Sequence, residues 1–123
     1  MAIVLNTKSY GFSGFNQAGF SAYRNTDASF PSGFSYLTSK VNTGLGGKPS
    51  NGKWNLSLPH IATASTACSC EGSVLGTDYV RVDFEFSPAT SAADRLDAWT
   101  RLRDLVASNE FKASLTGLTQ PSA

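Results

Sequence analysis

Apolar and polar side chains alternate in three segments of the chain, at residues 34–42, 53–58 and 79–86. Alternation with a period of two is typical of strands that bury one face. The side chains on the apolar side of these segments are Leu37, Ser39, Val41, Trp54, Leu56, Leu58, Val80, Val82, Phe84 and Phe86. The three segments therefore predict antiparallel strands with one apolar and one polar face.

Short strands joined by glycine-rich turns are predicted for the first part of the chain. Ile3–Leu5 is expected to form a first strand and Tyr10–Phe20 a loose ribbon, and residues 43–52 form a glycine-rich connection. Pro59 is expected to end the strand that contains Trp54, because proline has no N–H group to donate within a central ladder. The first two thirds of the sequence thus predict a sheet.

Helical spacing replaces the alternation after residue 90. Ser91, followed by Asp94 three residues later, predicts a capping box at the start of a helix over residues 92–108. Its apolar positions keep helical spacing and are Leu96, Trp99, Leu102, Leu105 and Val106. Asn109 is expected to cap a second short helix that stops at Gly117. Strands followed by helices indicate the α+β class.

The four large apolar side chains at residues 80–86 need more cover than one helix pair supplies. The chain has 123 residues, of which 41% are hydrophobic and only 15% charged, so it is expected to form one domain with a sparsely charged surface. Burying each such side chain is worth roughly 1.5–3 kcal/mol, a large share of the ~5–15 kcal/mol stability of a small domain. We therefore expect a second copy of the chain to cover this face.

Charges are few and unevenly distributed. The net charge is +1, but residues 1–60 carry five basic side chains and one acidic one, whereas residues 82–123 carry four basic and six acidic ones. This asymmetry fits a protein with one side facing an anion, and it also fits a solvated face. No charged leader precedes a long apolar core, and no run approaches the ~18 apolar residues of a membrane span, so we expect neither secretion nor membrane insertion.

Candidate catalytic residues are sparse. His60, the only histidine, lies beside Pro59 without a nucleophile motif such as G-x-S-x-G. Asp83 and Glu85 share one strand face and resemble a glycosidase carboxylate pair, but such a pair is more often a solvated face or an intersubunit contact. The glycines at residues 44–47 lack the spacing of a phosphate-binding loop. We expect no enzymatic activity and no cofactor.

Cys68 and Cys70 are the only cysteines, and one residue separates them. This spacing is unfavourable for a relaxed disulfide within the chain. It is also incomplete as a metal site, because the chain has no second cysteine pair and a single histidine. No bound metal is expected.

An ordered series of segments resembles the coat proteins of single-stranded RNA bacteriophages, the levivirus family, and most closely the Q-beta-like branch. The series consists of Lys53–Leu58, a Thr/Ala-rich loop with two cysteines, Thr77–Phe86, Thr90–Arg95 and a helix ending at Ser108. The resemblance is best over residues 53–123 and rests on pattern and length before them. No single motif in it is specific.

The resemblance implies an α+β fold with an N-terminal hairpin at residues 1–20, a five-stranded antiparallel sheet at 21–87 and two helices at 91–117. Two subunits would interlock as a homodimer, with the helices of each lying across the sheet of the other. Its implied core consists of Val80, Val82, Phe84, Phe86, Leu96, Trp99 and Leu102. Dimers would assemble in the host bacterial cytoplasm into an icosahedral capsid, usually of T=3 symmetry, as part of the virion.

The resemblance also implies that the inner face of the sheet binds genomic RNA, including a stem-loop whose binding represses translation of the replicase and marks the genome for packaging. The matching positions are Tyr36, Thr38, Lys40, Asn55, Ser57, Tyr79 and Arg81. Cys68 and Cys70 would form disulfides between neighbouring subunits around the five-fold and quasi-six-fold axes. A phage maturation protein is a further implied partner. The alternative is a non-viral, self-assembling β-rich interaction module without RNA specificity.

Overall fold

The computed structural model describes residues 2–63 and 70–121 of the chain. Contacts divide the chain into two units, Met1–Glu85 and Phe86–Ala123. The first unit holds the sheet and the second the helices, and each is described by itself. In the described residues, neither helix is long and apolar enough to cross a membrane.

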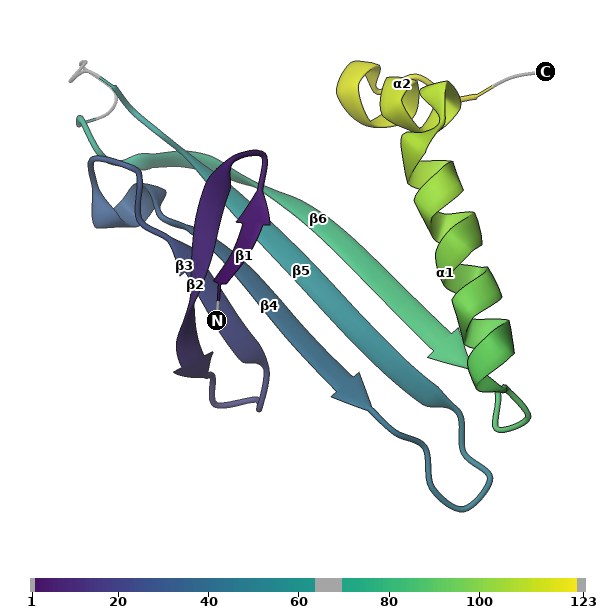
Figure 1. The fold of residues 1–123 in the computed structure, drawn as a ribbon. Coiled ribbons are helices and arrows are strands. Elements are labelled where there is room, and N and C mark those ends of the chain that lie inside the picture. Colours follow the sequence, from purple (N-terminus) through teal and green to yellow (C-terminus); the bar gives the residue numbers. More distant parts are fainter. Residues whose placement is uncertain (1, 64–69, 122–123) are drawn as a thin grey trace. The chain divides into compact units, whose positions relative to one another are not determined.

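Six strands in sequence order form one sheet (Figure 1). They are β1 (Ala2–Leu5), β2 (Lys8–Phe15), β3 (Ser21–Asn25), β4 (Ser35–Asn42), β5 (Ser50–Ile61) and β6 (Val74–Phe86). Asn6 and Thr7 join β1 to β2 with positive φ angles of 49° and 64°, as a tight hairpin turn requires. The six strands include both strands of the expected N-terminal hairpin, because β2 continues the ladder and places Gly11 opposite Arg24. The described part of residues 21–87 holds four strands and not the expected five.

The strand register sorts the side chains onto two faces. Thr38 lies opposite Asn55 and Leu37 lies opposite Leu56. On β6, the even-numbered positions share the side of Leu56, because the Phe84 ring lies against Gly52. The polar face carries Arg24, Tyr36, Thr38, Lys40, Lys53, Asn55, Ser57, Tyr79, Arg81, Asp83 and Glu85. The apolar face carries Tyr10, Tyr23, Leu37, Trp54, Leu56, Leu58, Val80, Val82, Phe84 and Phe86.

The best-packed part of the apolar face lies over β2, β3 and β4. Tyr10 is only 2% exposed, and its hydroxyl forms a 2.8 Å hydrogen bond with Ser35 Oγ. The Phe12 ring meets the Tyr23 ring edge-on, with 5.6 Å between centroids. By contrast, Val80 and Val82 on β6 remain 39% and 40% exposed. On the apolar face, Tyr10 and Leu37 are therefore buried, whereas Phe12 on β2 and the valines of β6 stay exposed.

Two helices follow the sheet: α1 (Ala92–Ala107) and α2 (Asn109–Gly117). The predicted capping box is confirmed, since Asp94 N–H donates to Ser91 Oγ and Ser91 N–H donates to the Asp94 carboxylate, both at 3.2 Å. None of the described residues of either helix is buried. The apolar side chains of α1 are thus available to a partner.

The prediction that Asn109 caps the second helix is wrong. Ser108 is the cap, and its Oγ accepts a 3.2 Å hydrogen bond from Phe111 N–H. Ser108 is extended, with φ −73° and ψ 149°, so it can separate the two helices while Asn109 already begins the second one.

The prediction that Pro59 ends its strand is also wrong, because β5 continues to Ile61. The ladder between β4 and β5 extends only to Tyr36 opposite Ser57. On the β4 side, Pro59 therefore lies beyond the ladder, and its missing N–H interrupts no hydrogen bond there.

Gly52 offers a test of the packing between β5 and β6. A methyl group at its Cα would lie 2.1 Å from Cζ of Phe84, so the ring would have to move. We expect Gly52→Ala to destabilise the fold by about 1 kcal/mol, at the lower end of overpacking effects, and to lower the urea midpoint. Gly11→Ala is the matched control, because no heavy atom lies within 4 Å of its added methyl group. Equal midpoints for both variants would contradict this packing.

Candidate nucleic-acid interface

Four neighbouring polar side chains lie at the centre of the polar face. Tyr36 lies opposite Ser57, and Thr38 lies opposite Asn55. Oδ1 of Asn55 is buried and has no hydrogen-bond partner among the described residues. An unsatisfied buried acceptor costs about 1–3 kcal/mol, so a donor group from a ligand would be favoured here. These four residues, predicted from the sequence to share one face, therefore lie on neighbouring strands and directly opposite one another.

Tyr79 and Arg81 form a stacked pair on β6. The Arg81 Cζ lies 4.8 Å from the centroid of the Tyr79 ring, within the range of cation–π attraction. The Tyr79 residue is still 54% exposed. The pair therefore presents a cation and an accessible aromatic ring on the same face.

Lys40 has a structural role that the sequence did not reveal. Its Nζ donates a 2.8 Å hydrogen bond to the Ala18 carbonyl oxygen and lies 5.6 Å from the Phe20 ring centroid. In the same turn, Asn16 Oδ1 accepts hydrogen bonds from Ala18 N–H and Phe20 N–H, both at 3.0 Å. Lys40 thus fastens the turn between β2 and β3 and is only partly available to a phosphate.

Two further cations belong to the polar face. Lys53 lies directly opposite Lys40 and is exposed. It continues the alternation with Asn55 and Ser57, so the sequence contained the signal for it. Arg24 lies opposite Tyr36, a placement that only the pairing of β3 with β4 reveals. Together with Lys40 and Arg81, these two residues give the polar face four basic side chains. Asp83 and Glu85 are the acidic side chains on the same face.

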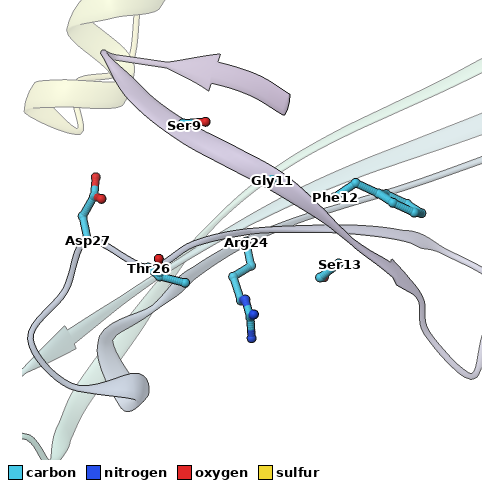
Figure 2. Close-up of a pocket in the computed structure, with 7 residues that line it drawn as sticks. All are labelled: Ser9, Gly11, Phe12, Ser13, Arg24, Thr26 and Asp27. Carbon is cyan, nitrogen blue, oxygen red and sulfur yellow. The ribbon is translucent and has the colours of Figure 1, made fainter. Parts of the chain in front are cut away.

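A hollow of about 460 Å³ lies beside β2, β3 and the loop that follows (Figure 2). Its lining comprises Ser9, Gly11, Phe12, Ser13, Arg24, Thr26 and Asp27. The Asp27 carboxylate already accepts a 3.0 Å hydrogen bond from Asn25 Nδ2. Arg24 and Asp27 point in different directions in Figure 2, so the hollow lacks the convergent polar groups of a small-molecule site.

The residues weighed for catalysis, His60, Asp83 and Glu85, lie on β5 and β6. His60 Nε2 lies 2.6 Å from Asp78 Oδ2, in an exposed pair that links β5 to β6. Asp83 and Glu85 line a hollow of about 440 Å³ together with Lys53. Within residues 2–63 and 70–121, no group of three or more His, Cys, Asp or Glu side chains is arranged to hold a metal.

The base of the cysteine loop is held by a short 3₁₀ helix at Pro31–Gly33. Ser32 Oγ donates to the Gly72 carbonyl oxygen, and Ala62 N–H donates to the Ser73 carbonyl oxygen at 2.9 Å. Cys70 is exposed and unpaired in the single chain. Cys68 lies outside the described residues, so the intersubunit disulfides stay a prediction.

The residues predicted for the dimer core are accessible. Phe84 and Phe86 are half-buried, and the other five, Val80, Val82, Leu96, Trp99 and Leu102, are exposed. Both β6 and α1 therefore present apolar side chains that a partner can cover.

A six-stranded antiparallel sheet in sequence order, followed by two C-terminal helices, is the RNA phage coat fold. The virus-like particle of Beihai levi-like virus 21 shares this fold with a TM-score of 0.81 and 13% identity, over 100% of this chain and 96% of that one. The bacteriophage EMS014 coat protein has a TM-score of 0.77 and 16% identity, over 99% of this chain and 98% of that one. The bacteriophage GA capsid protein has a TM-score of 0.72 and 14% identity, over 94% of this chain and 93% of that one.

No protein-family model and no curated protein matches the amino-acid sequence. At 13–16% identity, the similarity to solved structures establishes the fold. The expected coat fold is therefore confirmed over the whole chain.

Proposed function

We propose that this chain is the coat protein of an RNA bacteriophage, which dimerises and assembles into an icosahedral capsid around the genome. The observation that carries the proposal is the coat fold, which the chain shares over its full length with subunits of virus-like particles. A T=3 arrangement is part of the proposal.

Exposed apolar side chains support self-assembly. Val80 and Val82 on β6, and Leu96 and Trp99 on α1, are all exposed in the single chain. Large exposed apolar side chains that gather on one element often mark an interaction site. In the proposed dimer, the helices of each subunit lie across the sheet of the other and remove both sets of side chains from water.

The composition of the polar face supports RNA binding on the inside of the shell. Its four basic side chains can neutralise phosphates, and its tyrosines can stack on unpaired bases. We propose that this face binds the genome and a stem-loop, through which the protein represses replicase translation and selects its RNA. The residues that we assign to this contact are Tyr36, Thr38, Asn55, Ser57, Tyr79 and Arg81, with Lys40 in a secondary role.

A self-assembling module without RNA specificity is the rival, since a solvated polar face has a similar composition. Expression of the chain alone separates the two. We expect uniform spherical particles by electron microscopy and a high ultraviolet 260/280 ratio from enclosed host RNA. Particles free of RNA would favour the rival, and a stable monomer at high concentration would overturn both.

Lys53 and Lys40 are expected to differ in their contribution to RNA binding. Lys53→Gln removes an exposed cation, so the slope of log affinity against log salt should fall by about 0.7–0.9. Lys40→Gln should change the slope less, because Lys40 Nζ is bound to Ala18, and should instead loosen the turn. Filter binding of an RNA stem-loop with a randomised loop, at several salt concentrations, measures both. A larger slope change for Lys40→Gln would contradict the assignment.

A further inference from the structure

The polar face continues from the candidate interface onto β3 and β2. Arg24 on β3 lies opposite Tyr36 on β4, and Gly11 on β2 lies opposite Arg24. Directly opposed residues of antiparallel strands share one face of the sheet. Both Arg24 and Gly11 also line the hollow of about 460 Å³ beside β2 and β3 (Figure 2). The hollow therefore adjoins the polar side chains that the proposed function assigns to RNA.

We propose that this hollow binds one nucleotide of a single-stranded RNA segment, with a phosphate on the Arg24 guanidinium and the ribose near the hydroxyl groups of Ser9 and Thr26. The inference rests on the proposed function and deepens it, because the nucleotide belongs to unpaired RNA that flanks the bound stem-loop. Arginine guanidinium groups and serine or threonine hydroxyl groups commonly contact the phosphates and sugars of nucleic acids.

The Arg24 side chain is available to a phosphate. It is exposed and forms no hydrogen bond or ion pair with another described residue. Lys40 on the same face differs, because its Nζ already donates to the Ala18 carbonyl oxygen. A guanidinium carries five N–H donors in a planar fork that matches the geometry of a phosphate. Arg24 is therefore suited to hold a phosphate at the hollow.

The carboxylate that lines the hollow does not neutralise Arg24. Asp27 Oδ2 accepts a 3.0 Å hydrogen bond from Asn25 Nδ2, and Figure 2 shows the Asp27 and Arg24 side chains pointing in different directions. The other side chains that line the hollow are uncharged. The positive charge of Arg24 is thus left to attract an anion.

Small residues leave room for an RNA backbone beside Arg24. No heavy atom lies within 4 Å of a methyl group added to Gly11 or to Gly14, and Gly14 lies opposite Ala22. Glycine is favoured where a ligand approaches the protein backbone closely. Ligand pockets typically measure roughly 300–1,000 Å³. The hollow lies at the smaller end of this range, so a single nucleotide is the unit that we expect it to hold.

Attachment to a stem-loop compensates for the few polar groups in the hollow. A free nucleotide would bind weakly, because its phosphate meets a single guanidinium. Adjacent strands lie roughly 4.8 Å apart, so one RNA chain can contact Tyr36 and Arg24 at the same time. Once the stem-loop is bound, its unpaired flank reaches the hollow at an effective concentration in the millimolar range. The site therefore contributes only to RNAs that carry an unpaired flank.

Filter binding with tailed and untailed RNAs tests the site. The untailed RNA is a stem-loop with a randomised loop, and the tailed RNA carries a short run of unpaired uridines at each end. We expect the parent chain to bind the tailed RNA about three- to fivefold more tightly, which is the effect of one exposed charge pair. Arg24→Gln should lose this gain. Its slope of log affinity against log salt for the tailed RNA should fall by about 0.7, the value for one phosphate of a single strand.

Arg24→Lys and Lys8→Gln are the matched variants. Arg24→Lys keeps the charge, so the salt slope should stay at the parent value while part of the gain is lost with the planar fork. Lys8→Gln removes an exposed cation of β2 that alternates onto the apolar face, because Lys8 lies two residues before Tyr10. The gain from the tail should be unchanged in this variant. Its loss in Lys8→Gln would assign the effect to net charge and overturn the proposal.

Gly11→Val tests the hollow itself. The valine side chain would project into the space beside Arg24, where an added methyl group meets no heavy atom within 4 Å. Valine suits a strand, so the urea midpoint should not fall, whereas the gain from the tail should be lost. Gly76→Val on β6 is the matched control, because an added methyl group meets no heavy atom within 4 Å there either. The gain should persist in this control.

The outcomes separate this site from the coat function. RNA-filled particles whose parent chain binds tailed and untailed stem-loops equally would overturn the nucleotide site alone. A gain from the tail that survives Arg24→Gln, or that survives Gly11→Val in folded protein, would do the same. A parent chain that binds neither RNA and encloses none would refute the proposed RNA binding itself.

Discussion

Trp99→Lys is expected to abolish particle assembly while α1 stays folded. Trp99 is 57% exposed in the single chain, so its replacement removes little packing within its own subunit. In the proposed dimer the indole is buried against the partner, and a lysine there would bring an unpaired charge into an apolar contact. Loss of a buried tryptophan at an interface typically costs about 2 kcal/mol or more. Electron microscopy and sedimentation measure assembly, and circular dichroism measures helix content.

Asp104→Lys provides the matched control for this result. It introduces the same side chain on α1, five positions later and hence on another side of the helix. A cation near the C-terminal end of a helix is favoured by the helix dipole, so this variant should assemble. Normal particles from Trp99→Lys would remove Trp99 from the dimer core and weaken the interlocked arrangement.

Local sequence signals predicted the elements that depend on short-range physics. The alternation at residues 34–42 corresponds to β4, and that at 79–86 lies within β6. Ser91 and Asp94 form the predicted capping box, because both hydrogen bonds join residues three apart. Such features need no information about distant parts of the chain.

The errors occurred where a distant partner decides the local structure. Pro59 stays in a strand because the β4 ladder has already ended beside it, and that end is set by the start of β4 at Ser35. The N-terminal hairpin is part of the sheet because β2 pairs with β3 as well as with β1. Neither the length of a ladder nor the choice of its partner is visible in a local pattern.

The candidate interface shows the same division. Alternation and the resemblance placed Tyr36, Thr38, Asn55 and Ser57 on one face, and the register confirms that they share it. Alternation also placed Lys40 on this face. It did not predict the hydrogen bond from Lys40 to Ala18, because that contact depends on how the turn between β2 and β3 folds back. Strand periodicity thus predicts which face a side chain occupies and leaves open whether a neighbour already binds it.

Tyr79→Ala is expected to weaken RNA stem-loop binding by about one to two orders of magnitude while particles still form. Stacking of a base on an aromatic side chain is worth about 1–3 kcal/mol, and Tyr79 is the exposed ring that Arg81 holds in place. The apolar face of the strand is unchanged in this variant, so the contacts proposed to drive dimerisation remain.

Tyr79→Phe separates stacking from hydrogen bonding, because it keeps the ring and removes only the hydroxyl. We expect it to bind within a few-fold of the parent chain in filter-binding assays with a stem-loop of randomised loop sequence. Equal affinity for Tyr79→Ala and the parent would exclude a stacking role for this ring. An equal loss for both variants would assign the contribution to the Tyr79 hydroxyl. Tyr79 would then bind the RNA by a hydrogen bond and not by stacking.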